Sequence, residues 1–385
     1  MSRSWEEVPF GQAPLRIIDG DRGKAYPKHG DFSDEGYCLF LSASNVTSSG
    51  FDFSECQFIS EQKDEELRKG RLSRKDVVLT TRGTLGNVAY YGDDTPFDHL
   101  RINSGMVIMR TDPAKLLPEF LYGFLRSPRF LQQVEQLRSG AAQPQLPIRD
   151  INRIKLPIPR KDMQERIVGV FAAYDELIEN NRRRMTLLED AARQLYREWF
   201  VRLRFPGYEH TRITKGVPDG WDRVPLGDRV TLNYGKALKA EDRSDGPCPV
   251  YGSSGIVGMH EKALVAAPGI VVGRKGNVGS VYWCPKDYWP IDTVYFIDAE
   301  TSNLWLYYAL QHMHFISTDV AVPGLNRDFA YSRPLLVPES RVVRDFLDAA
   351  GPLREQLAKL DEMNERLRAA RDLLLPRLMS GEIAV

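Results

Sequence analysis

The chain has 385 residues, 42% hydrophobic and 27% charged, which is typical of a folded protein large enough for two or three domains. Its 52 basic residues balance 52 acidic ones, which argues against attachment to nucleic acid by bulk positive charge, although basic groups on one face could still bind it. The sequence has no apolar run of roughly 18 residues and no apolar signal-peptide core at its start, so we expect a cytoplasmic protein without membrane contact.

Residues 1–155 are rich in glycine, aromatic and β-branched residues. DVVLTTRG at 76–83 and INSGMVIMR at 102–110 predict short strands separated by turns. LPEFLYGFLRSPRFLQQVEQL at 117–137 predicts a helical segment packed on the sheet. We therefore expect a compact α+β domain.

Residues 156–208 carry a long helical pattern that ends at RFPG. Asp162, with Glu165 three residues later, predicts an N-terminal capping box. A helix of roughly 40 residues would be about 60 Å long. Intervals of three and four residues form a heptad stripe, interrupted only by two polar residues; its positions are Ile167, Val170, Tyr174, Leu177, Asn181, Arg184, Leu188, Ala191 and Leu195.

Residues 209–335 again predict short strands, as in GIVVGRKG and DTVYFID, with a helical patch at SNLWLYYALQHMHF. Residues 336–385 predict a second long helix. We expect Gly351 and Pro352 to break or kink it, with a straight helix of about 40 Å starting near Pro352. Its stripe consists of Phe346, Ala350, Leu353, Leu357, Leu360, Asn364, Leu367, Arg371 and Leu374.

Five short matches in the same order indicate that the chain contains two copies of one unit. They pair WEEVPFG with WDRVPLG, one GKA tripeptide (23–25) with another (235–237), GTLGNV with GNVGSV, PEFLYGFL with NLWLYYAL, and KLPIPRKDMQERIVGVF with PLLVPESRVVRDFLDAA. Around the third match, TTRGTLGN and VGRKGNVG differ by what we interpret as an inserted residue beside the basic position. The two copies are therefore related but diverged.

The two heptad stripes could each belong to a helix packed on its own domain. Because they match and each follows a globular unit, we favour a coiled coil, and an antiparallel pair would place the two globular units at opposite ends as a ruler. Asn181 and Asn364 fall near the middles of the stripes. They could form a buried polar pair that sets the register, or both could face water at the edge of the seam.

The sequence contains no recognised catalytic signature. GxxxxGK[ST], HExxH, GxSxG and [DNS]PP[YFW] are all missing, and the six histidines are scattered. Four isolated cysteines form no CxxC pair, so neither a zinc site nor a disulfide framework is indicated. We expect neither catalysis nor a metal site in this chain.

Basic and polar residues gather around the predicted turns at matching places in both copies. Such residues contact base edges and phosphates in DNA grooves. One cluster alone would suggest only a hairpin turn with solvated charges, but four favour a shared DNA-binding face. The candidates are Arg22, Lys24, Tyr26, Thr81, Arg82, Asn103, Lys236, Lys239, Ser253, Ser254, Arg274, Lys275 and Asn277.

Several segments together resemble the specificity subunits of type I restriction-modification systems. They are DGDRGKAYPKHGDF, FDFSECQFIS, TTRGTLGNVAYY and RINSGMVIMR in the first half, TLNYGKALKA, PVYGSSGIVG, GIVVGRKGNVGSVYW and WPIDTVYF in the second, and the helix endings LYREWFVRLRFPG and LLPRLMSGEI. The resemblance covers essentially the whole chain. It implies two α+β target-recognition domains, each reading one half of a split DNA sequence, separated by two long spacer helices.

The resemblance also implies a division of labour. The helices would dock two modification subunits, which carry S-adenosylmethionine and the adenine methyltransferase motifs, while restriction subunits cleave and translocate double-stranded DNA. The diverged domains imply an asymmetric target. Two alternatives remain, namely a coiled-coil scaffold whose two modules bind proteins rather than DNA, and a self-sufficient nuclease with an unrecognised site.

Overall fold

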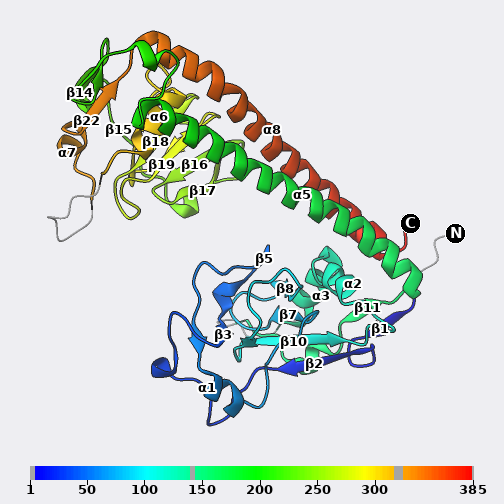
Figure 1. The fold of residues 1–385 in the computed structure, drawn as a ribbon. Helices are drawn as coiled ribbons and strands as arrows, with labels where there is room; N and C mark the ends of the chain where they lie inside the picture. Colours follow the sequence, from blue (N-terminus) through cyan, green and yellow to red (C-terminus); the bar gives the residue numbers. More distant parts are fainter. Residues whose placement is uncertain (1–4, 139–143, 316–323, 384–385) are drawn as a thin grey trace. The chain divides into compact units, whose positions relative to one another are not determined.

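The computed structural model describes residues 5–138, 144–315 and 324–383 (Figure 1). The chain divides into two compact units, the first made of Met1–Asn180 with Met363–Val385 and the second of Asn181–Glu362. Each unit therefore contains part of both long helices. Within the described residues, no helix has the length and apolar character needed to cross a membrane.

The first unit contains two principal sheets. Four strands pair antiparallel in the order β2-β10-β7-β8, and three pair in the order β6-β3-β9, with β3 and β9 parallel. All four residues of β7, VVLT, are buried, because helices cover one face of the sheet and further strands cover the other. The strands are β1 Glu7–Pro9, β2 Leu15–Asp19, β3 Cys38–Leu41, β4 Val46–Thr47, β5 Gly50–Phe51, β6 Phe58–Ile59, β7 Val77–Thr80, β8 Val88–Tyr90, β9 Leu100–Ile102, β10 Met106–Thr111 and β11 Lys155–Pro157.

Two helices arise from the helical patch predicted at 117–137. Ser127 separates them, because its hydroxyl accepts a hydrogen bond from Phe130 N at 3.3 Å and so caps the second helix, which Pro128 begins. Both helices bury aromatic residues in the core beneath the four-stranded sheet. The helices of this unit are α1 Glu61–Glu66, α2 Pro118–Leu125, α3 Pro128–Leu137, α4 Ile148–Ile151, the first part of α5 Lys161–Tyr196 and the last part of α8 Ser340–Met379.

The second unit repeats this topology. Its sheets have the orders β15-β21-β18-β19 and β17-β16-β20, and β16 and β20 are again the parallel pair. The strands are β12 Ile213–Thr214, β13 Val217–Pro218, β14 Asp222–Pro225, β15 Asn233–Tyr234, β16 Cys248–Gly252, β17 Gly255–His260, β18 Gly269–Gly273, β19 Val281–Cys284, β20 Trp289–Pro290, β21 Val294–Ile297 and β22 Pro334–Val337, and the short helices are α6 Leu304–Gln311 and α7 Arg327–Tyr331. The predicted pair of similar α+β units is confirmed.

One of the predicted sequence matches is wrong. Gly20 follows β2 and Gly235 follows β15. A Cβ added to Gly20 would lie 2.1 Å from Asn103 O, and one added to Gly235 would lie 2.1 Å from Ile291 O. Gly235 therefore corresponds to Gly20, and the two GKA tripeptides are not equivalent. A three-residue match carried too little information to set the alignment.

The long helices are α5 Lys161–Tyr196, extended by a π-helical stretch at Arg197–Val201, and α8 Ser340–Met379. In the second unit, Glu189 of α5 pairs with Arg354 of α8, and the rings of Tyr196 and Phe346 are 6.1 Å apart. Residue numbers rise along one helix as they fall along the other, so the helices run antiparallel, as expected.

The start of α5 differs from the prediction. The helix begins at Lys161, and both Met163 N and Gln164 N donate to Arg160 O, at 3.0 and 3.1 Å. Asp162 therefore lies inside the first turn and is not the N-cap. Its carboxylate still lies where negative charge favours a helix.

Three of the nine positions predicted on α5 are exposed, and in each case the residue that follows is less exposed. Leu177 is 47% exposed, whereas Ile178 is 4% exposed, and likewise Ala191 is exposed while Ala192 is buried. The first step after Ile167 is four residues, to Phe171, and not three, and both alternations fit a heptad. The heptad stripe that fits the exposures is Ile167, Phe171, Tyr174, Ile178, Asn181, Met185, Leu188, Ala192 and Leu195. Val170 is also half-buried and, like Ile167 and Phe171, packs on the core of the first unit.

The predicted stripe on α8 is correct. Leu353, Leu357, Leu360, Asn364, Leu367 and Leu374 are all buried or half-buried. Asn181 is 5% exposed and Asn364 is 1% exposed, so neither faces water. The polar positions in both stripes are thus interior positions.

The expected break at Gly351 and Pro352 is also wrong, because α8 is helical on both sides of and through this pair. Proline removes the hydrogen bond to the carbonyl four residues earlier and crowds it, which normally interrupts a helix. Here Phe346 and Ala350 are both fully buried in the core of the second unit. Their packing outweighs the local preference.

Replacing Pro352 with alanine should therefore stabilise the protein by about 1–2 kcal/mol, because it restores a helical hydrogen bond at an exposed position. Urea unfolding of the purified chain measures this change. Gly351→Ala is the matched variant, since its Cβ would meet no atom within 4 Å. It should raise the free energy of unfolding by about 0.5–1 kcal/mol. A destabilised Pro352→Ala would show that the proline shapes α8.

Candidate nucleic-acid interface

A glycine turn, comprising residues 80–88 in the first unit and 273–281 in the second, has the same backbone in both copies. The φ angles are 74° at Gly83 and 82° at Gly86, and 77° at Gly276 and 78° at Gly279. Only glycine adopts this left-handed region without strain. The sequence therefore contains these glycines because the turn between the two strands requires them.

Hydrogen bonds show that the two turns also have the same length. Gly86 N donates to Thr80 O at 3.2 Å, and Gly279 N donates to Gly273 O at 2.9 Å. The inserted residue expected from the sequence is not present. Arg82 corresponds to Lys275, and Thr81 corresponds to Arg274.

Each turn is held on two sides by backbone hydrogen bonds. Thr81 N donates to Gly105 O at 2.8 Å and Thr81 O accepts from Leu146 N at 3.0 Å. The equivalent bonds in the second unit join Arg274 N to Thr293 O at 2.9 Å and Leu325 N to Arg274 O at 2.8 Å. The basic residue that follows therefore projects from a rigid support.

The loop after β2 brings further candidates beside the first turn. Arg22 donates to Asp19 Oδ1 at 3.1 Å and to Ser104 O at 3.3 Å. The Tyr26 hydroxyl lies 3.5 Å from Ser104 N, and the Asn103 side chain accepts from Gly105 N at 2.8 Å. Arg22 and Arg82 are exposed, as is Lys24, for which no contact defines a position beside the turn.

A buried carboxylate, Asp21, anchors this loop. It accepts hydrogen bonds from Gly23 N at 2.6 Å and Arg68 N at 2.7 Å. Burial alone would raise the pKa of Asp21, but these backbone donors outweigh it and hold the pKa below the ordinary value. Asp21 is therefore ionised at neutral pH and fixes the loop that carries Arg22.

Thr81 is among the predicted DNA-binding residues, but its side chain is buried. It is 6% exposed, and its hydroxyl donates to Gly105 O at 3.0 Å. Its side chain therefore supports the turn and does not face a groove. Ser253 is also buried, and its carbonyl accepts from the Ser280 and Tyr282 hydroxyls at 2.6 and 3.1 Å.

In the second unit, Arg274 lies among aromatic rings. Its guanidinium is 5.3 Å from the centre of the Tyr234 ring and 5.7 Å from that of Tyr295, and Nη2 donates to Asp292 O at 2.8 Å. Arg327 lies over the same Tyr234 ring at 5.2 Å. This arrangement holds a flexible side chain in one orientation.

The remaining candidates of the second unit are more loosely held. Lys236 Nζ lies 5.9 Å from the Trp289 ring, and Lys239 pairs with Glu241 at 3.4 Å. Ser254, Lys275 and Asn277 are exposed. The sequence analysis missed Trp289 and Arg327, whereas Tyr234 lies in the basic segment NYGKALKAEDR that the sequence already pointed to. The tyrosine stands next to the glycine that follows β15, but only folding brings Arg327 to it.

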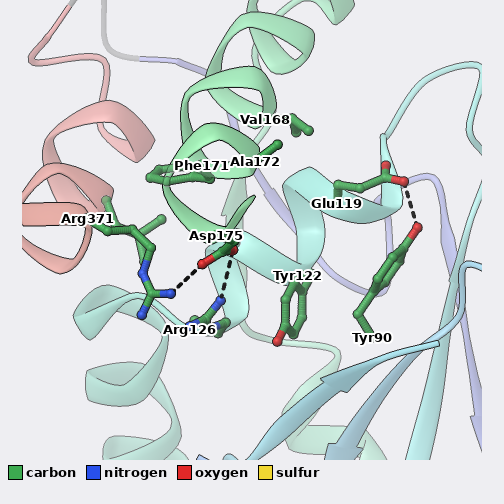
Figure 2. Close-up of a pocket in the computed structure, with 11 residues that line it drawn as sticks. Tyr90, Glu119, Tyr122, Arg126, Val168, Phe171, Ala172, Asp175 and Arg371 are labelled. Atoms are coloured by element: carbon green, nitrogen blue, oxygen red, sulfur yellow. Dashed lines mark hydrogen bonds and ion pairs between the residues drawn. The ribbon is translucent and has the colours of Figure 1, made fainter. Parts of the chain in front are cut away.

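A cavity of about 190 Å³ lies elsewhere in the first unit, between α2, α5 and α8 (Figure 2). At one side the Tyr90 hydroxyl donates to Glu119 at 2.6 Å. At the other, Asp175 pairs with Arg371 at 2.5 Å and with Arg126 at 3.8 Å (Figure 2). These ion pairs join the three helices, so we interpret the rim of the cavity as structural.

No three histidine, cysteine or acidic side chains among residues 5–138, 144–315 and 324–383 are arranged to hold a metal ion. His312 and His314 lie two residues apart at the end of α6. His312 stacks on Tyr196 at 5.2 Å, and burial lowers its pKa. It is a packing residue of the second unit.

We expect Gly86→Ala to destabilise the protein by about 1–2 kcal/mol, because a Cβ at φ 82° is strained and would lie 3.3 Å from Leu131. Thermal unfolding measures the change. Gly123→Ala is the control. It lies in α2, where an added Cβ makes only ordinary contacts at 3.8 Å, so it should be neutral or stabilising. Equal effects of the two variants would contradict the strain argument.

Comparison with known proteins agrees with this architecture. Residues 16–190 match the family model of the Type I restriction modification DNA specificity domain. The chain is 26% identical to the Type I restriction enzyme HindI specificity subunit of Haemophilus influenzae, over 98% of this chain and 99% of that protein. It is 21% identical to the MjaIX specificity subunit of Methanocaldococcus jannaschii, over 85% of this chain and 82% of that protein.

A solved structure has the same fold. The type I restriction-modification S subunit from M. genitalium aligns with a TM-score of 0.52 and 16% identity, covering 98% of this chain and 97% of that one. The similarity in fold and sequence extends over nearly the whole chain, including both units and the two long helices. Over nearly its whole length the chain is similar to the specificity subunits of type I restriction-modification systems.

Proposed function

We propose that this chain is the sequence-specific DNA-recognition subunit of a type I restriction-modification complex, and that its two units read the two halves of a split, asymmetric target. The observation that carries this proposal is that both units contain the same glycine turn, held by equivalent backbone hydrogen bonds, but with different side chains. Each support presents a glycine turn and a neighbouring loop that carry basic residues. Two equal supports with unequal side chains suit the reading of two unequal half-sites.

Recognition would combine two kinds of contact. Hydrogen bonds from side chains to base edges supply discrimination, with each good bidentate contact contributing about 1–3 kcal/mol. Contacts from lysine and arginine to phosphates set the position of each unit and make binding depend on salt. In the first unit this set includes Arg22 and Arg82, and in the second unit it includes Arg274 and Lys275; within each unit they lie on or beside the glycine turn.

The reaction itself would belong to partner subunits. We propose that two modification subunits dock on α5 and α8, and that they bind S-adenosylmethionine and methylate an adenine flipped out of the duplex. The internal repeat supports two docking places, because each helix follows an equivalent strand, β11 or β22. Restriction subunits would join the same complex.

The first test concerns phosphate contacts. Arg82→Ala and Lys275→Ala should each weaken binding of all duplexes to a similar extent. Each should also lower the slope of log K against log salt concentration by about one, because one phosphate contact is lost. Fluorescence anisotropy of the complex with its modification subunits, titrated at several salt concentrations, measures both.

Lys286→Ala is the control for this test, because Lys286 is exposed and follows β19 at the end of that strand away from the glycine turn. It should leave the salt slope unchanged. A complex that binds no duplex from a random pool above background would contradict the DNA-recognition function and favour a protein scaffold.

A second test concerns the spacer. We propose that α5 and α8 set the number of unread base pairs between the half-sites. One heptad inserted beside Asn181 and another beside Asn364 would lengthen both helices by about 10 Å. Duplexes selected by the altered complex should keep both half-sites but contain about three more unread base pairs. An unchanged gap would contradict the ruler.

A further inference from the structure

In the first unit, an arginine is held at a defined point of the support. Arg22 Nη2 donates to the carbonyl of Ser104 and to the carboxylate of Asp19, at 3.3 and 3.1 Å. About half of the Arg22 side chain remains exposed, at 49%. The guanidinium is therefore oriented and still accessible.

In the second unit, Arg274 is held in a comparable way. Its Nη2 donates to the carbonyl of Asp292 at 2.8 Å, and its guanidinium stacks on the Tyr234 ring at 5.3 Å. The side chain is half-buried by these contacts. Here an aromatic ring takes the place of the carboxylate as the second support.

The two acceptor carbonyls occupy equivalent positions. Ser104 precedes Gly105, whose carbonyl accepts from the first turn, and Asp292 precedes Thr293, whose carbonyl accepts from the second. Each unit thus directs a guanidinium to the same carbonyl of its fold.

The second supports are equivalent as well, because they end equivalent edge strands. Asp19 ends β2 and pairs with Val107, while Tyr234 ends β15 and pairs with Tyr295. Both therefore lie at the same corner of their sheets, next to the acceptor carbonyl.

The arginines themselves do not occupy equivalent positions in the repeat. Arg274 corresponds to Thr81, whereas Arg22 lies on the loop after β2. The two copies therefore use different parts of the chain to place the same planar fork at one point. A general need for positive charge would not require that geometry.

The neighbouring basic position, Arg82 in one unit and Lys275 in the other, is equivalent in the repeat but differs in side-chain shape. Arg82 and Lys275 are equivalent, and both side chains are exposed. The charge is the same in the two units but the shape is not, since lysine has no planar fork. A position that keeps charge alone suits a phosphate, which is the same in every sequence.

A position that keeps the planar fork suits a guanine, whose O6 and N7 accept two parallel hydrogen bonds from arginine. We propose that Arg22 and Arg274 are the guanine-reading residues of the two half-sites, and that Arg82 and Lys275 contact phosphates. Each half-site then contains a guanine at the corresponding place. This inference rests on the DNA-recognition function proposed above.

The test compares sequence preferences of reconstituted complexes that contain the modification subunits. Duplexes randomised over the target are selected with the wild-type complex and with the Arg274→Lys and Arg22→Lys variants. Each variant should lose preference at one guanine, in one half-site only, by on the order of 10- to 100-fold. Preferences elsewhere should remain, because the charge is kept.

Lys275→Arg is the matched control, since it adds a fork at the position assigned to phosphate, and it should alter no base preference. Replacing the selected guanine by 7-deazaguanine removes the N7 acceptor. The wild-type complex should then bind more weakly, by on the order of 10-fold, whereas the affinity of the Arg274→Lys complex should not change. Thermal unfolding of each variant shows whether it is folded.

The outcomes separate the inference from the function on which it rests. A wild-type complex that selects no sequence contradicts DNA recognition itself. A wild-type complex that selects a target without guanine in one half-site overturns the assignment for that unit. An Arg274→Lys complex that weakens on all sequences equally, or keeps its guanine preference, overturns the assignment of Arg274.

Discussion

The left-handed glycines of the two turns are the constraint on which the proposed interface depends. Gly83 and Gly86 in one unit, and Gly276 and Gly279 in the other, reverse the chain between two paired strands. Because the backbone is fixed at these glycines, the positions of the basic residues that precede them, Arg82 and Lys275, are fixed as well. The same hydrogen bonds to the start of β10 or β21 then hold each turn against its sheet. Side chains at the rim can differ between the units without disturbing this support.

The contrast between shared backbone and unshared side chains would allow one fold to serve the two specificities that we propose. Carbonyls of Ser104 and Asp292 offer the same acceptor in both units, but one unit supports its arginine with the Asp19 carboxylate and the other with the Tyr234 ring. An ion pair leaves a nearly neutral pair, whereas a ring leaves the arginine cationic. The electrostatic surroundings of the two sites therefore differ, although their backbones match.

The long helices show tertiary packing outweighing local preference. Proline and glycine in adjacent positions of α8 would end an isolated helix, yet buried Phe346 and Ala350 hold that part of α8 in the core of the second unit. Asn181 and Asn364 are interior although polar. Buried polar residues in a helical seam disfavour other registers, which suits the spacer role that we propose for α5 and α8.

Fold class, tandem repeat and helix direction followed from the sequence alone, because repeats and heptads are periodic over tens of residues and tolerate local errors. Features that depend on a single residue did not follow. Ile178 rather than Leu177 is buried, since both fit a heptad. Gly20 rather than Gly23 matches Gly235, since only a 2.1 Å approach of the Cβ to a backbone carbonyl distinguishes the two.

For the candidate site, the sequence by itself determined which residue types gather at the turns. Glycines mark the tight turns, and the arginines and lysines beside them are visible in the same segments. Only the tertiary structure decided what each one does. Thr81 is buried and bonded to Gly105, and Arg327 reaches Tyr234 from a distant helix. Burial and orientation depend on contacts between segments far apart in the chain, and no local pattern of residues specifies them.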